Sequence, residues 1–213
     1  MVDATVRPRL FSPGRMGPMQ LRNRVVMAPM VVQLGSESGA VTRRTVDYYA
    51  RRAAGGAGLV IVEASYIAPE AKAYACQLGI DRDGLLPGHF ELVEAIHRHG
   101  AKVAIQIHHG GGRADPALTG GVLVAPSPGA PDAHAVVPRE ATPQEIETLA
   151  ESYARAAGRA QRAGYDAVEI HGAHGYLIHE FLSPASNRRS DAYGGSQENR
   201  LRFAGLVIRR VRE

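Results

Sequence analysis

Short apolar runs alternate with amphipathic helical patterns four times along this chain, and this alternation constrains the fold more than any other feature. The apolar runs occupy residues 24–28, 59–64, 102–107 and 165–170. Each is followed by a stretch with apolar residues at helical spacing, beginning near residues 42, 86, 142 and 197. Unbroken apolar runs are typical of strands buried on both faces, and strands that alternate with helices form parallel sheets. We therefore expect an α/β protein with a parallel sheet.

The clearest helix begins after Thr142. Thr142 suits the N-cap, Pro143 suits the first helical position, and Glu145 is placed to complete a capping box. Gly164 ends the pattern. The spacing predicts these buried helical residues: Val46, Tyr49, Ala50 and Ala53; Phe90, Val93 and Ile96; Ile146, Leu149, Ala150, Tyr153, Ala157 and Ala160; Leu201, Ala204, Ile208 and Val211.

The repeated strand–helix unit favours a closed barrel over an open dinucleotide-binding sheet, because no G-x-G-x-x-G motif follows the first strand. An eight-stranded (β/α)8 TIM barrel needs about 250 residues. The 213 residues supply about the first four βα units. Residues 10–21, rich in Gly and Pro, predict a short N-terminal hairpin. Residues 114–138 predict an irregular loop over the active face.

Composition narrows the classes of protein that remain. The single cysteine, Cys76, excludes an internal disulfide framework and an iron–sulfur cluster held by this segment alone. No run reaches transmembrane length, and the first residues lack the apolar core of a signal peptide, so we expect a cytoplasmic protein without a membrane partner. The net charge is +4, but the arginines occur as scattered pairs beside acids. That pattern predicts solvated helix faces and no nucleic-acid partner.

Candidate chemistry is concentrated directly after the fourth apolar run. His171, His174 and Tyr176 follow it, separated by glycines. The loops at the carboxyl ends of parallel strands carry the active sites of α/β proteins. Two imidazoles three residues apart could both reach one substrate oxygen, or one of them could be structural.

A metal-dependent barrel hydrolase is the alternative that the same histidines leave open. It would need a third ligand and an activating carboxylate at neighbouring strand ends. The sequence offers only His108 or His109 and Glu63 for these roles.

Residues 171–203 carry a long motif in fixed register. The matching residues are His171, Ala173, His174, Gly175, Tyr176, Leu177, His179, Phe181, Leu182, Ser183, Pro184, Asn187, Arg189, Asp191, Tyr193, Gly194, Gly195, Ser196, Glu198, Asn199, Arg200 and Phe203. This motif resembles the signature of the old yellow enzyme family, which are flavin-dependent ene-reductases with a TIM-barrel fold. We expect the polar residues among 187–200 to form a hydrogen-bonded scaffold that orders the loop.

The resemblance implies an FMN-dependent oxidoreductase that uses NAD(P)H to reduce activated C=C bonds of small α,β-unsaturated substrates. It implies that His171 and His174 bind the substrate oxygen and that Tyr176, a phenol that stays protonated at neutral pH, donates the proton. The cofactor-binding residues that it implies are Ala28, Pro29, Met30, Ala64, Gln106 and His171. Arg113 matches less well, because the run HHGGGR has one glycine more than the family pattern.

The resemblance also implies that residues 1–213 are the N-terminal part of a single FMN-binding barrel domain. The later strands of the family carry the loops that hold the flavin phosphate. We therefore expect the chain to need the second half-barrel or a partner chain, and the complete protein to form a homo-oligomer. A [4Fe–4S] cluster would belong only to a further C-terminal part. The alternative is a catalytically inert truncated chain or a half-barrel assembly partner.

Overall fold

A four-stranded parallel sheet forms the centre of the molecule. The computed structural model describes residues 8–129 and 136–213. The strands of the sheet are β3 (Val26–Met27), β4 (Leu59–Tyr66), β5 (Lys102–His108) and β8 (Ala167–Ile170), in the spatial order β3-β4-β5-β8. All three pairings are parallel, with Val60 opposite Val103 and Ile105 opposite Val168. The order in space follows the order in sequence, as it does around a (β/α)8 barrel.

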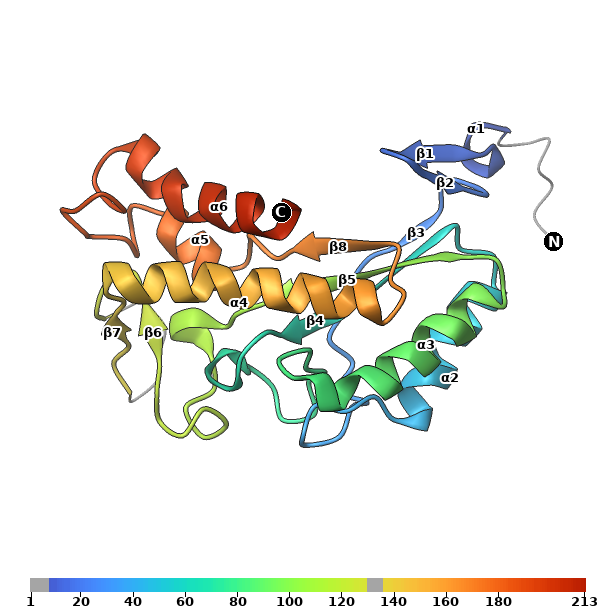
Figure 1. The fold of residues 1–213 in the computed structure, drawn as a ribbon, viewed down its shortest axis with the longest axis horizontal. Coiled ribbons are helices and arrows are strands. Elements are labelled where there is room, and N and C mark those ends of the chain that lie inside the picture. Colours follow the sequence, from blue (N-terminus) through green and yellow to red (C-terminus); the bar gives the residue numbers. More distant parts are fainter. Residues whose placement is uncertain (1–7, 130–135) are drawn as a thin grey trace.

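Helices connect the strands and cover the sheet. The α-helices are α1 (Pro8–Phe11), α2 (Arg43–Ala54), α3 (Leu86–His97), α4 (Pro143–Arg162), α5 (Leu177–Leu182) and α6 (Gln197–Arg212). Three short 3-10 turns, η1 (Pro69–Ala71), η2 (Asp83–Leu85) and η3 (Gly111–Arg113), lie in the connections. Helix α4 crosses in front of the sheet in Figure 1, with α3 below it and α6 above it. The core lies between these helices and the sheet, and every residue of β4 is buried.

The two ends of the sheet carry different structures. At the amino ends of the strands lies an antiparallel hairpin of β1 (Gly14–Met16) and β2 (Met19–Leu21), so the hairpin expected from residues 10–21 is confirmed. At the carboxyl ends lie α5, η3 and a two-stranded parallel ribbon of β6 (Val124–Ala125) and β7 (Arg139–Glu140) (Figure 1). The strand ends that were expected to carry chemistry therefore open on the side opposite the hairpin.

The four strands and four long helices predicted from the sequence are all present, but two buried faces were wrong. In α3 the buried stripe is centred on Leu92 and Ile96, and it includes His89 instead of Phe90, which is 56% exposed. His89 is satisfied there by the Tyr165 hydroxyl and the Gly79 carbonyl, each at 2.8 Å.

In α6 the buried residues are Phe203, Leu206 and Val207, because this side of the helix packs on α4 and α5. Leu201 and Ile208, which were predicted to be buried, are exposed, and Ala204 and Val211 are only partly buried. The Phe181 and Phe203 rings, with centroids 4.5 Å apart, join α5 to α6.

Residues 114–129 and 136–138, the described parts of the predicted loop, have little regular structure apart from β6. Part of that prediction, residues 130–135, lies outside the described residues. Strand β7 pairs with β6 and leads into the start of α4.

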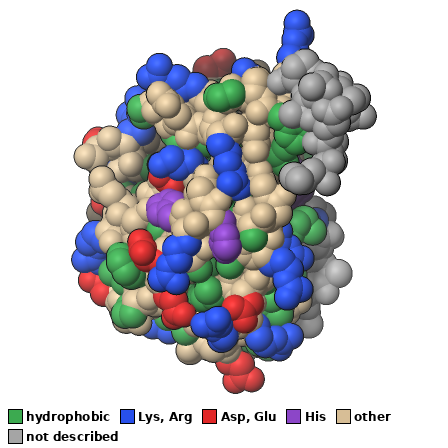
Figure 2. All heavy atoms as spheres, turned by 90° about the vertical axis from the view of Figure 1, so that its right-hand side faces the viewer, with side chains coloured by type: hydrophobic (Ala, Val, Ile, Leu, Met, Phe, Trp, Pro, Cys, Tyr) green, Lys and Arg blue, Asp and Glu red, His purple; other side chains and the backbone are tan. Residues whose placement is uncertain are grey.

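The surface supports the interpretation of the charges as solvated. Figure 2, which shows the face on the hairpin side, has basic, acidic and apolar side chains intermixed, without a continuous basic stripe. Across the two described ranges, no helix combines the length and the apolar content needed to cross a membrane.

Candidate active site

A cleft of about 770 Å³ opens at the carboxyl ends of the four central strands. It has the volume of a typical small-molecule site. Its lining includes all eight candidate residues named from the sequence: Ala28, Pro29, Met30, Ala64, Gln106, His171, His174 and Tyr176. It also includes residues that were not predicted, among them Val31, Tyr74 and Glu169. Residues separated by up to 148 positions in the sequence therefore share one cavity because their strands end side by side.

One wall of the cleft is small and apolar. Ala28, Pro29 and Met30 follow β3, and Ala64 lies near the end of β4. The backbone just after Met30 is fixed by the buried carboxylate of Glu63, which accepts a hydrogen bond from Val32 N at 2.9 Å. A planar aromatic ligand could therefore approach this wall closely.

Gln106 on β5 presents the polar edge of the cleft. Its Nε2 donates to Glu169 Oε1 on the neighbouring strand β8 at 2.5 Å, and the two residues are register partners. This bond fixes the orientation of the amide. The side-chain oxygen Oε1 of Gln106 and the second hydrogen on Nε2 are then available to a ligand that offers a donor and an acceptor side by side.

Sequence reasoning did not single out Glu169. The available signal was a carboxylate inside an otherwise apolar strand, which needs a partner when it is partly buried. The structure supplies that partner as Gln106, so the two polar residues of the adjacent strands account for each other.

The two histidines of the motif contact each other. The Ala173 amide donates to His171 Nδ1 at 3.3 Å, which assigns the proton of the neutral ring to Nε2. His171 Nε2 lies 3.4 Å from His174 Nδ1. Burial, with a smaller contribution from the charge of His174, lowers the pKa of His171 to about 4. His171 is therefore a neutral hydrogen-bond donor at neutral pH.

The loop that carries these residues is held in an unusual backbone conformation. His174 has a φ of +60°, a value that is uncommon for a residue with a side chain. Arg113 Nη1 donates to the His174 carbonyl at 2.8 Å. At Gly175, φ is +78°, which favours glycine, and a Cβ atom would lie 2.7 Å from Arg113 Cζ, so a larger residue would strain the backbone and displace the guanidinium. Despite the extra glycine in its motif, Arg113 thus supports the histidine loop.

Tyr176 is the N-cap residue of α5 and lines the cleft. Its oxygen lies 2.8 Å from the Tyr74 hydroxyl. Its ring packs edge-to-face against the rings of His171 and His108, with centroids 5.1 and 4.4 Å away. Burial raises the pKa of Tyr176, so the phenol is protonated at neutral pH and could act as an acid.

Two of the residues that a metal site would have needed, His109 and Glu63, form hydrogen bonds elsewhere. His109 is buried, its Nδ1 accepts from Gly111 N at 3.0 Å, and burial lowers its pKa to about 3. Glu63 binds the backbone below the cleft and does not line the cleft. Within residues 8–129 and 136–213, no group of three His, Cys, Asp or Glu side chains is arranged to hold a metal ion. The geometry therefore does not support the hydrolase alternative.

The polar residues of the segment 187–200 form the scaffold that the sequence predicted. Asn187 Nδ2 donates to the carbonyls of Phe181 and Tyr193 at 2.7 and 2.8 Å. The buried Arg189 side chain forms a bidentate pair with Asp191 and donates to the Ala141 carbonyl. These contacts lie outside the cleft and order the chain between α5 and α6.

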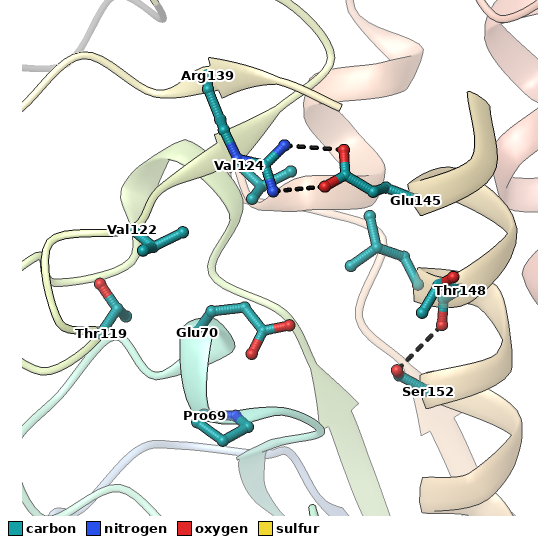
Figure 3. A pocket seen from close by; sticks show the side chains of 10 residues that line it. Pro69, Glu70, Thr119, Val122, Val124, Arg139, Glu145, Thr148 and Ser152 are labelled. Atoms are coloured by element: carbon teal, nitrogen blue, oxygen red, sulfur yellow. Dashed lines mark hydrogen bonds and ion pairs between the residues drawn. The ribbon is translucent and has the colours of Figure 1, made fainter. Parts of the chain in front are cut away.

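A second pocket, of about 380 Å³, lies between η1, β6 and α4 (Figure 3). None of the eight candidate residues lines it. Its arginine, Arg139, is bonded through both terminal nitrogens to Glu145, whose carboxylate also caps α4 (Figure 3). Arg139 and Glu145 thus have a structural role at the start of the helix.

The fold and the cleft together define the chain as part of an α/β barrel with its site at the carboxyl ends of the strands. Residues 9–213 match the model of the NADH:flavin oxidoreductase / NADH oxidase family, so the chain belongs to this family, that of the old yellow enzymes. The chain is 49% identical over 208 residues to an NADH oxidase from Thermoanaerobacter brockii, with 97% of this chain and 32% of that protein covered. It is 42% identical over 206 residues to an NADPH dehydrogenase from Bacillus subtilis (strain 168), with 96% of this chain and 60% of that protein covered.

A solved structure of morphinone reductase in complex with tetrahydroNAD superposes on the chain with a TM-score of 0.90. The identity is 37%, and the match covers 96% of this chain and 60% of that one. The structural relatives are (β/α)8 barrels, so this chain supplies about the first four βα units of such a barrel and its N-terminal hairpin. The chain spans about a third to three fifths of the length of the relatives that it matches.

Proposed function

We propose that the cleft binds FMN and that the protein uses NAD(P)H to reduce the activated C=C bond of a small α,β-unsaturated carbonyl compound. The observation that carries this proposal is the convergence of eight candidate residues from four strand ends on one cleft. The bound flavin would accept hydride from the nicotinamide and supply it to the alkene. The remaining chemistry is assigned to the side chains of this chain.

The residues of the cleft suit a flavin ring. Ala64 and the tip of Ala28, Pro29 and Met30 leave room for a planar ring system. Gln106, oriented by Glu169, offers an acceptor and a donor to the pyrimidine edge of that ring. His171 lines the same cleft, and in this proposal it would contact both the flavin and the substrate.

His171 and His174 would hold the substrate carbonyl. A neutral His171 donates through Nε2, and His174 lies close enough for a second bond to the same oxygen. Hydride addition to the β-carbon builds negative charge on that oxygen, and preorganised donors stabilise this charge more than they stabilise the ground state. Tyr176 would then transfer its hydroxyl proton to the α-carbon.

The proposal applies to a protein in which these four units belong to a closed barrel. Val168 and Ile170 on β8 are only partly buried, whereas the inner strands β4 and β5 are largely buried. Further strands would cover this edge. We propose that they come from the same polypeptide or from a partner chain.

Replacing both histidines tests the function directly. In the flavin-loaded protein, His171→Ala/His174→Ala should lower the affinity for phenolic ligands. It should also lower kcat/KM for enone reduction by about a hundredfold or more, because two oxyanion donors are lost. Flavin reduction by NAD(P)H reports on the integrity of the site. The control is His99→Ala, which removes an exposed histidine at the end of α3. Unchanged enone kinetics in the double variant would refute the assigned role.

A further inference from the structure

Tyr74 reaches the reaction site from a part of the chain that carries no family motif. It lies between β4 and α3 and lines the cleft. Its hydroxyl is 2.8 Å from that of Tyr176, across 102 positions in the sequence. Tyr74 is 36% exposed, so part of the residue is in contact with solvent. Its hydroxyl oxygen contacts Tyr176, the proposed acid.

A buried glutamine holds Tyr74 in place. Gln77 Oε1 accepts hydrogen bonds from the backbone amides of Ala73 and Tyr74, at 2.8 and 3.3 Å. Gln77 Nε2 donates to the carbonyl of Ala64 at 2.8 Å and lies 3.2 Å from His108 Nδ1. Gln77 therefore links the backbone of Tyr74 to Ala64, which lines the cleft.

The surroundings of Tyr176 give its partner a chemical role. Tyr176 packs against the neutral, buried ring of His108, whose pKa burial lowers well below its usual value. Neither this ring nor the apolar tip of the cleft stabilises a phenolate well, whereas the charge of Arg113 favours it and lowers the pKa of Tyr176. In the resting site the hydrogen bond with Tyr74 acts in the opposite direction and raises the pKa of Tyr176. The Tyr74 hydroxyl lies within hydrogen-bond distance of the Tyr176 oxygen and could donate to it as charge develops there. Hydrogen bonds to charged groups are stronger than those between neutral groups.

We propose that Tyr74 is a positioning residue that assists proton donation by Tyr176, an inference that rests on the proposed function. The Tyr176 O–H bond breaks as a C–H bond forms at the substrate α-carbon, and the Tyr74 hydroxyl donates to the phenolate oxygen that remains. The Tyr74 proton then passes to Tyr176, and water at the exposed side of Tyr74 restores it. The net change is one proton taken from solvent, and the hydride comes from NAD(P)H through the flavin.

A double-mutant cycle tests this assignment. In the flavin-loaded protein, Tyr74→Phe should slow single-turnover alkene reduction about ten- to a hundredfold, the effect of losing one hydrogen bond to a charged group. It should also increase the solvent deuterium isotope effect, because proton transfer becomes limiting. In the Tyr176→Phe background, Tyr74→Phe should have no further effect. Tyr48→Phe, a change on α2 away from the cleft, is the matched control.

Flavin reduction by NAD(P)H protonates no carbon, so Tyr74→Phe should slow it much less than it slows alkene reduction. Tyr48→Phe should leave both rates within about twofold of the wild type. The proposal is overturned if Tyr74→Phe leaves alkene reduction unchanged, if it slows flavin reduction equally, or if its effect persists in the Tyr176→Phe background. If the wild-type protein takes up flavin and is reduced, yet reduces no activated alkene, the proposed function itself fails before any variant is compared.

Discussion

At the scale of single residues, the molecule contains several histidines whose burial excludes a positive charge. Burial lowers the pKa of His89, lowers that of His108 well below its usual value, and lowers that of His109 to about 3. His171 in the cleft has its pKa lowered to about 4 for the same main reason. These rings serve as neutral hydrogen-bonding groups.

This burial predicts that the protein loses stability in mild acid. An unfolded histidine takes up a proton near pH 6.5, whereas folded His109 does so only near pH 3. Between these values the unfolded chain binds the extra proton, so the free energy of unfolding falls as the pH falls. The loss is about 1.4 kcal/mol per pH unit for a fully buried histidine.

Urea unfolding between pH 7 and pH 5 measures the effect, above the range in which ion-paired carboxylates such as Glu145 titrate. His109→Asn keeps an acceptor for the Gly111 amide but does not titrate, so its stability should depend less steeply on pH. His99→Asn, at an exposed position, should leave the slope unchanged. Equal slopes for wild type and His109→Asn would contradict the prediction.

At the scale of elements, sequence patterns predicted best where a local signal determines the structure. The capping box of α4 is formed as expected: Thr142 Oγ1 accepts from Glu145 N at 3.2 Å, and Glu145 Oε2 accepts from Thr142 N at 2.9 Å. Helix α5 was not predicted, because its six residues are too few to show a helical period and it lacks a side-chain cap. The buried face of α6 was wrong because its contacts with α4 and α5 are tertiary.

The capping box predicts a measurable contribution to stability. Thr142→Ala removes the side chain that satisfies the Glu145 amide, so the free energy of unfolding should fall by about 1 kcal/mol. Thr148→Ala is the matched control on the same helix, at an exposed position where alanine has the higher helix propensity. Its stability should be equal to or slightly above that of the wild type. Similar losses from both changes would refute the role of the cap.

At the scale of the whole molecule, the strand order explains how much of the site the sequence could predict. The motif 171–203 and the family resemblance that it carries gave eight residues, and the parallel order β3-β4-β5-β8 brings all of them to one cleft. Tyr74, Glu169 and Gln77 were not identified, because their importance depends on partners in distant segments. The Tyr74–Tyr176 and Gln106–Glu169 contacts join residues 102 and 63 positions apart, which no local pattern encodes.

The most direct test of the central claim is the absorption spectrum of the protein purified from the cells that produce it. We predict a yellow protein that carries about one FMN per cleft and that NAD(P)H bleaches under anaerobic conditions. A folded, colourless protein that takes up no added FMN would contradict the claim that the cleft formed by Pro29, Ala64, Gln106 and His171 is a flavin site.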